Sequence, residues 1–201
     1  LIMKSLGITG NIGSGKSYIL NFLSKKSIKT YDLDYVAKTI YKEDESVKDE
    51  ILKIFPEVIS TKKEIDTKIL GKLVFNDDEM LNSLKKIIWP RIERFIQNKK
   101  NSNQDEFIAF EGAVIIDANW HKMFDCIWII DTSIEISKKR VLDSRDISEI
   151  DFMNIINNQM KLKEMQILLE NENCKYTIIE NNSNIDELNT KVEKELKQIR
   201  L

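Results

Sequence analysis

The chain has 201 residues, of which 42% are hydrophobic and 32% charged, and its formal net charge is -2. This length suits one domain, or a core with inserted lobes, that needs no structural metal. The balanced charge argues against a general nucleic-acid binder, and two separated cysteines, Cys126 and Cys174, make neither a disulfide framework nor a zinc pattern. No apolar stretch approaches the roughly 20 residues of a membrane span. We therefore expect a cytoplasmic protein that binds small molecules, with no nucleic-acid, membrane or protein partner.

Short apolar segments alternate with helical stretches along the chain. We expect strands, in chain order, at Lys4–Thr9, Ile28–Tyr31, Phe107–Phe110, Ile127–Asp131 and Tyr176–Glu180, and helices at Lys16–Lys25 and Tyr35–Tyr41. The first, third and fourth of these strands lack polar alternation, as is typical of strands covered on both faces. The pattern predicts an α/β fold of three α/β/α layers with a five-stranded parallel sheet.

Two polar, helix-rich intervals interrupt this alternation. Residues 44–100 hold both prolines and are too long for a simple crossover, so we expect an inserted helical lobe at about 44–103. Residues 139–173 are charged and helix-prone, which is typical of a mobile lid. The nucleotide-binding core of the single domain then consists of about 1–43, 104–138 and 174–201.

Residues 10–17 match the phosphate-binding motif G-x-x-x-x-G-K-[ST] in full. The matching residues are Gly10, Asn11, Ile12, Gly13, Ser14, Gly15, Lys16 and Ser17. The glycines let the backbone curl so that its N–H groups point at an anion, and the helix that follows adds the positive end of its dipole. We expect Lys16 to reach the β- and γ-phosphates of ATP and Ser17 to help hold Mg²⁺. The preceding strand and following helix argue against a chance glycine-rich turn.

Other motifs distinguish between the classes of P-loop protein. The D-x-x-G and N-K-x-D motifs of a GTPase are absent. A small-molecule kinase needs a base near the γ-phosphate, and Asp32 and Asp34 follow the second strand, where ligands gather in a parallel sheet. In an extended strand end these two side chains share a face, so spacing alone does not choose between them. One of the two is expected only to cap the next helix.

Further charged residues fit the chemistry of phosphoryl transfer. Glu111 follows the third strand, as a Walker B carboxylate does, and is a candidate Mg²⁺ ligand directly or through water. Its alternative is a strand-end carboxylate that faces solvent. Arg140 and Arg145 on a closing lid would stabilise charge on the transferred phosphoryl group, the alternative being a solvated helix face.

Several stretches together resemble the dephospho-CoA kinase family over nearly the whole chain. Residues 7–17 are similar to the family's G-[LI]-T-G-G-I-G-S-G-K-S, with Asn11 in place of a glycine, and residues 32–34 resemble its D-A-D. Residues 70–77 resemble L-G-x-x-V-F-x-D of the acceptor lobe. Further similar stretches are Ile88–Ile92, where Trp89 replaces the His of His-Pro; Glu111–Asp117, where Ala113 and Asp117 replace Pro and Glu; Gln159–Met160; and Ile179–Asn182.

The resemblance implies transfer of the γ-phosphate of ATP to the 3′-hydroxyl of the ribose of dephospho-CoA, the last step of coenzyme A synthesis, with Mg²⁺. It implies Asp34 as the catalytic base, helped by Lys16 and Arg140. Expected ATP contacts are residues 10–17 and Arg145, expected metal ligands are Ser17 and Glu111, and expected acceptor contacts are Thr9, Asp34, Phe75, Trp89 and Pro90. The alternatives are a P-loop kinase of another small acceptor, such as a nucleotide, and a nucleotide-binding regulator without turnover.

Overall fold

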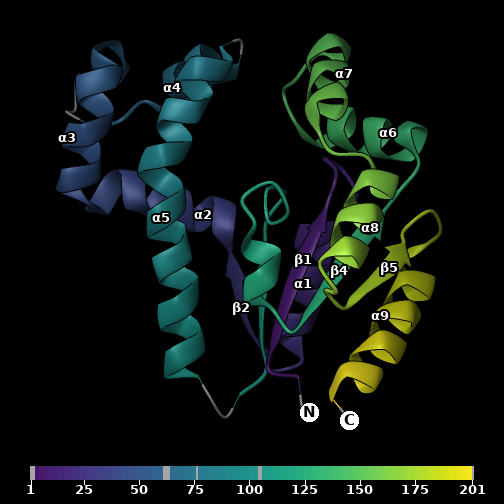
Figure 1. Cartoon of the computed structure of the whole chain (residues 1–201). Helices are drawn as coiled ribbons and strands as arrows, with labels where there is room; N and C mark the ends of the chain where they lie inside the picture. The colour runs from purple at the N-terminus through teal and green to yellow at the C-terminus, as the bar shows by residue number, and fades with distance from the viewer. Residues whose placement is uncertain (1–2, 61–63, 76, 104–105, 201) are drawn as a thin grey trace. The chain divides into compact units, whose positions relative to one another are not determined.

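The computed structural model describes residues 3–60, 64–75, 77–103 and 106–200 (Figure 1). The chain forms two compact units. The first consists of Leu1–Asp32 and Lys100–Leu201, and the second is Leu33–Lys99.

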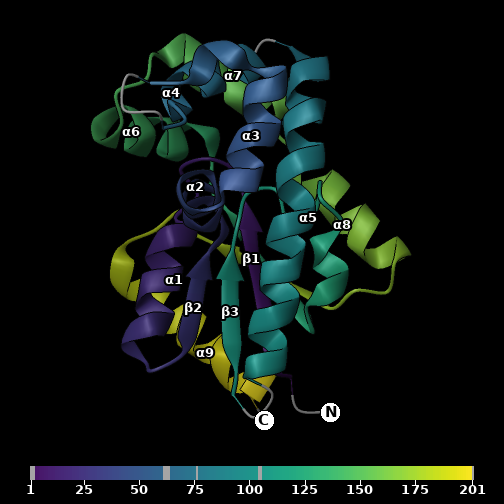
Figure 2. The ribbon, with the colours of Figure 1, turned by 90° about the vertical axis from the view of Figure 1, so that its left-hand side faces the viewer.

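The first unit is built on a sheet of five parallel strands. The strands are β1 Ser5–Gly10, β2 Lys29–Asp32, β3 Ile108–Glu111, β4 Cys126–Asp131 and β5 Tyr176–Glu180. Their order is β2-β3-β1-β4-β5, and Figure 2 shows β2, β3 and β1 side by side. Since all strands run the same way, their carboxyl ends share one edge of the sheet. The expected five-stranded parallel sheet is confirmed.

Helices cover both faces of this sheet. The helices of the unit are α1 Lys16–Lys25, α6 Ile134–Ser144, α7 Glu149–Asn158, α8 Leu162–Asn171 and α9 Ile185–Arg200, with a short 3₁₀ helix, η2, at Trp120–Met123. Apolar residues of α1 and α9 pack with Ile8, Trp128 and Ile130 in one core. Ile129 points to the opposite face, where it lies beside Met165 of α8. The three α/β/α layers follow from these two contacts.

The second unit, residues 33–99, is helical. Its elements are α2 Leu33–Glu43, α3 Glu45–Ile54, a 3₁₀ helix η1 at Pro56–Val58, α4 Thr67–Phe75 and α5 Asp78–Ser102. Residues 100–102 of α5 count with the first unit. Val47, Ile51 and Phe55 are fully buried, and Arg91 of α5 forms an ion pair with Glu50 of α3 at 2.6 Å. Of the described helices, none combines the length and the apolar character needed to cross a membrane.

The start of α2 differs from the sequence-based expectation. We expected helix from Tyr35, but α2 begins at Leu33, directly after β2. Leu33 and Val36 are both buried, and their spacing of three residues places them on the same helix face. Asp34 is therefore in the first turn of a helix. The expectation that Asp32 and Asp34 share one face of an extended strand end is wrong.

Candidate active site

The phosphate-binding loop joins β1 to α1 and is closely packed against later parts of the chain. Gly13 and Gly15 have φ angles of 74° and 97°, which L side chains rarely adopt. A Cβ on Gly15 would lie 2.4 Å from Nδ2 of Asn181, and one on Gly13 would lie 2.7 Å from the carbonyl oxygen of Ser137. Both glycines are thus required by packing as well as by backbone conformation. The loop ends at the N-terminus of α1, and the positive end of a helix dipole favours an anion there.

The expected Mg²⁺ ligands Ser17 and Glu111 lie next to each other. The Ser17 hydroxyl donates to Oε2 of Glu111 at 3.2 Å, and the Glu111 side chain is buried. Lys16 is also buried, and its ammonium donates to the Asn11 carbonyl at 3.1 Å. Asp32 is the register partner of Glu111 on the neighbouring strand. Oxygen atoms from Ser17 and Glu111 are the donor type that Mg²⁺ prefers, so the residues present fit this ion.

Arg140 lies on α6, and its guanidinium is turned toward the end of β5. Its Nη2 donates to the main-chain oxygen and to Oδ1 of Asn181, at 3.2 and 3.3 Å. Its Nη1 is buried and has no hydrogen-bond partner among the described residues. Burial lowers the pKa of this guanidinium from its ordinary value. Arg145, by contrast, is exposed at the C-terminal cap of α6. The two arginines therefore differ in burial.

Three residues that the sequence analysis left without a role form hydrogen bonds with the phosphate loop: Gln159, Asn181 and Thr132. Gln159, at the end of α7, accepts a hydrogen bond from the Ile12 N–H at 2.9 Å. The Ile12 side chain packs with Val141, Phe152 and Ile156 of α6 and α7. Part of the expected lid is therefore joined to the loop by a polar and an apolar contact. Gln159 belongs to the Q-M match, which was the only sequence signal for it.

Asn181 is the second of these residues. Its Nδ2 donates to the Ser14 carbonyl of the phosphate loop at 2.7 Å, and its side chain is buried. Thr132, after β4, donates from its hydroxyl to the carbonyls of Ser14 and Asn181, at 3.2 Å each. Asn181 was part of the match to I-D-N-N, but the pattern alone does not say which atoms it would meet.

The expected base and most of the expected acceptor residues belong to the helical unit. Asp34 is exposed in the first turn of α2. Burial, with a smaller contribution from the Asp34 charge, raises the pKa of Tyr41 to about 12. Trp89 is half-buried on α5, next to Pro90, and the Lys85 ammonium lies 5.0 Å from its ring centroid.

The two remaining acceptor candidates are Phe75 and Thr9. The side chain of Phe75, at the end of α4, lies outside the described part of the structure. Thr9 is fully buried in β1 of the first unit, and its hydroxyl donates to the Ala113 carbonyl at 3.4 Å.

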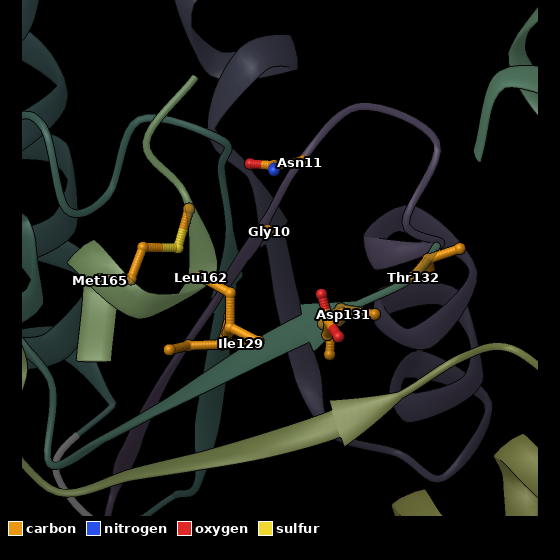
Figure 3. Close-up of a pocket in the computed structure, with 8 residues that line it drawn as sticks. Gly10, Asn11, Ile129, Asp131, Thr132, Leu162 and Met165 are labelled. Atoms are coloured by element: carbon orange, nitrogen blue, oxygen red, sulfur yellow. The ribbon is translucent and has the colours of Figure 1, made fainter. Parts of the chain in front are cut away.

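A small cavity lies beside the start of the phosphate loop (Figure 3). Gly10 and Asn11 line one part of it, Leu162 and Met165 of α8 another, and Asp131 lies at the end of β4. A carboxylate in this position repels phosphate. This cavity is therefore an unfavourable place for an anion.

A second group of potential metal ligands lies elsewhere in the first unit. One ligand atom each of His121, Glu172 and Cys174 lies within 4.8 Å of the others. Glu172 already pairs with Nε2 of His121 at 2.5 Å and with the Lys122 ammonium at 3.0 Å. Burial raises the pKa of the Cys174 thiol, which disfavours the thiolate that a metal needs. We interpret the group as an ion-pair cluster.

The fold and the loop together define the class of the protein. A shikimate kinase from Acinetobacter baumannii aligns with a TM-score of 0.54 and 15% identity, covering 98% of this chain and 93% of that chain. A Thermus thermophilus protein aligns with a TM-score of 0.80 and 23% identity over 99% of both chains. A dephospho-CoA kinase from Campylobacter jejuni aligns with a TM-score of 0.66 and 21% identity, covering 98% of this chain and 96% of that chain. With its full phosphate-binding motif, the chain has the fold and the loop of the P-loop kinase class.

Sequence relatives narrow this class to one family. The sequence model described as dephospho-CoA kinase matches residues 4–187. A dephospho-CoA kinase of Fusobacterium nucleatum is 31% identical over 194 residues, which cover 94% of this chain and 95% of that protein. One from Aquifex aeolicus is 28% identical over 196 residues, covering 96% and 95%. The chain belongs to the dephospho-CoA kinase family.

Proposed function

We propose that this chain transfers the γ-phosphate of ATP to the 3′-hydroxyl of the ribose of dephospho-CoA, giving CoA and ADP. The observation that carries the proposal is the pairing of Ser17 with Glu111 beside Lys16, in a chain whose family is dephospho-CoA kinase. A phosphate loop with a carboxylate at the Ser/Thr hydroxyl is the arrangement that phosphoryl transfer from a metal-bound nucleotide requires.

In this proposal the phosphate loop binds and orients ATP. The N–H groups at the start of α1 bind the phosphates, and Lys16 moves from the Asn11 carbonyl to the β- and γ-phosphates. Ser17 and Glu111 would hold Mg²⁺, which supplies charge neutralisation at the β- and γ-phosphate oxygens. Positioning and electrostatic stabilisation then provide most of the rate enhancement.

The remaining residues act on the acceptor and on the transferred group. Asp34 accepts the proton of the 3′-hydroxyl while the oxygen of that hydroxyl forms a bond to the γ-phosphorus. The bond between the γ-phosphorus and the β–γ bridging oxygen breaks, and ADP leaves. Arg140 stabilises the charge on the transferred group, and Arg145 supports it. Trp89 and Pro90 contact dephospho-CoA, with Thr9 and Phe75 as further acceptor contacts.

The proposal also covers the wider setting of the enzyme. Its partners are ATP and dephospho-CoA alone, with no nucleic acid, membrane or protein partner, and it works in the cytoplasm. We keep the core, acceptor lobe and lid as proposals. The compact helical unit is Leu33–Lys99, so α2, with Asp34, belongs to that unit and residues 100–103 belong to the first unit.

The test is ADP release with Mg-ATP and a panel of acceptors: dephospho-CoA, shikimate, nucleosides and water alone. We expect release with dephospho-CoA only. Lys16→Ala should abolish it, because loss of a phosphate clamp costs about 10²-fold or more in rate. Lys25→Ala, at an exposed position of the same helix, is the matched control and should leave the rate unchanged. Release with another acceptor, or turnover of Lys16→Ala within about threefold of wild type, would contradict the proposal.

A further inference from the structure

Asn181 occupies a fixed position between the end of β5 and the phosphate loop. Its side chain is 5% exposed, and its main-chain N–H donates to the Asp131 carbonyl at 2.8 Å. Its main-chain oxygen accepts from Thr132, and its Nδ2 donates to the Ser14 carbonyl at 2.7 Å. Nδ2 also fills the space that only a glycine at position 15 leaves open. The Asn181 amide therefore has one orientation, with Nδ2 toward the loop.

This orientation leaves the other end of the amide for Arg140. Oδ1 and the main-chain oxygen of Asn181 together accept from one nitrogen, Nη2, at 3.3 and 3.2 Å. The guanidinium is thus held by one edge, and the buried Nη1 has no partner among the described residues. A buried, charged donor without a partner is costly, and such an atom in a native structure calls for an explanation. An oxygen of a bound phosphate group is the acceptor that would satisfy it.

Few side chains could perform both tasks of Asn181. One short side chain must both donate to a carbonyl and accept from a guanidinium. Aspartate lacks the donor and would place a negative oxygen against the Ser14 carbonyl. Alanine lacks both groups. Both substitutions keep the main-chain hydrogen bonds to Asp131 and Thr132, so the strand end itself is retained.

We infer that Asn181 is a positioning residue for phosphoryl transfer: it fixes the Arg140 guanidinium against the phosphate loop, with the Nη1 edge directed at the phosphates of ATP. Asn181 touches neither substrate in this inference and acts through Arg140 and Ser14. The inference rests on the proposed function for its effect on turnover. Its effect on ATP binding is independent of which acceptor is used.

The first experiment compares Asn181→Ala and Asn181→Asp with Asn182→Asp. Asn182 is a matched control, because its Oδ1 accepts from the Ser133 N–H at 2.8 Å and a carboxylate keeps that bond. We expect each Asn181 variant to lower kcat about tenfold, less than the about 10²–10³-fold cost of removing an oxyanion donor outright. The KM for dephospho-CoA should stay at the wild-type value, and Asn182→Asp should behave as wild type. Unchanged kcat in both Asn181 variants would overturn the inference.

The second experiment is a double-mutant cycle that a purely structural role would not reproduce. Mg-ATP affinity is measured by calorimetry for wild type, Asn181→Ala, Arg140→Ala and the double variant, without any acceptor. We expect Asn181→Ala to weaken binding in the wild-type background and to have no further effect once Arg140 is absent. Equal losses in both backgrounds would overturn the inference.

A substitute variant and one further outcome separate the role of Asn181 from the proposed function. If Asn181→Ala does not fold, as judged by its circular dichroism and melting temperature, Asn181→Ser takes its place in the cycle. If wild type binds Mg-ATP and shows this coupling but does not phosphorylate dephospho-CoA, the proposed function fails and the role of Asn181 stands.

Discussion

Asp32 and Asp34 are two residues apart in the chain but belong to different elements and different units. Asp32 ends β2 beside Glu111, whereas Asp34 is exposed in the first turn of α2. An exposed carboxylate in a first turn also stabilises the helix, which is the structural alternative to a role as base. A measurement of kcat distinguishes the two roles, because only a general base contributes to the rate of phosphoryl transfer.

We predict that Asp34→Asn lowers kcat by about 10²–10⁴-fold, the usual contribution of a general base, with little change in the KM for ATP. Asp32→Asn is the matched control and should lower kcat less, because its place beside Glu111 suits a supporting carboxylate. Steady-state kinetics with both substrates varied gives the answer. A larger loss in Asp32→Asn would invert the assignment, and a loss below about tenfold in both would place the base elsewhere.

The Glu111 carboxylate is predicted to act through the metal. Glu111→Gln removes the charge but keeps the shape of a side chain that is 3% exposed and bonded to Ser17. We expect the Mg²⁺ concentration needed for half-maximal rate to rise about tenfold or more, the usual cost of losing a metal-supporting contact. Rates measured over a Mg²⁺ series at saturating ATP show this. An unchanged Mg²⁺ requirement would contradict a role of Glu111 in holding the ion.

At this scale the sequence predicts residues whose role depends on the local motif. Lys16 and Ser17 follow from the loop pattern, and Glu111 follows from a buried strand that ends in a carboxylate. Gln159 and Asn181 could not be predicted, because their roles depend on which main-chain groups the folded chain brings to them. No local sequence pattern around an Asn or Gln side chain predicts a hydrogen-bond partner that lies more than a hundred residues away.

At the scale of elements, the helical unit contains most of the residues that we assign to the acceptor. Trp89 and Phe95 make a useful pair on α5, since each is half-buried and each has a lysine ammonium over its ring, at 5.0 Å from Lys85 and 5.3 Å from Lys99. They differ in that only Trp89 lies in the segment that resembles the family's His-Pro.

We predict that Trp89→Ala raises the KM for dephospho-CoA about tenfold, equivalent to about 1.4 kcal/mol, and leaves the KM for ATP unchanged. An aromatic ring offers stacking and apolar contact to a base or a pantetheine chain, which alanine cannot replace. Phe95→Ala, the control, should change neither KM. Equal increases in both KM values for Trp89→Ala would contradict its assignment to the acceptor.

The elements themselves were predictable where an apolar run is short and bounded, as in β1, β4 and β5. The start of α2 was not, because Leu33 reads equally well as the end of a strand and as the first buried residue of a helix. Tertiary burial of Leu33 and Val36 decides between the two, and no local pattern reports it.

At the scale of the whole molecule, Asp125 ties the start of the central strand to β4. Its Oδ2 accepts from the N–H groups of Lys4 and Ser5 and from the Ser5 hydroxyl, at 2.9, 2.8 and 2.9 Å. Burial acts to raise the pKa of this carboxyl, but the hydrogen bonds outweigh it and the net pKa is lowered. A carboxyl with a lowered folded-state pKa stabilises the fold above its unfolded pKa, and this stabilisation is lost as the pH falls.

We predict that Asp125→Asn unfolds at lower denaturant concentration than wild type at about pH 6, and that the difference closes toward about pH 3, below the ordinary carboxyl pKa of about 3.9. Asp49→Asn, on an exposed position of α3, is the control and should show no such trend. Urea unfolding at a series of pH values measures the difference. A difference that stays constant over this range would mean that the Asp125 charge contributes nothing.

The central claim is that the phosphate of ATP reaches one particular hydroxyl of dephospho-CoA. The most direct measurement uses ATP labelled in its γ-phosphate, dephospho-CoA and Mg²⁺, with the product then treated with a 3′-nucleotidase. We predict that the label enters CoA in an amount equal to the ADP formed and that the nucleotidase releases all of it. Label that appears as free phosphate, or that stays on the product after 3′-nucleotidase treatment, would contradict the claim.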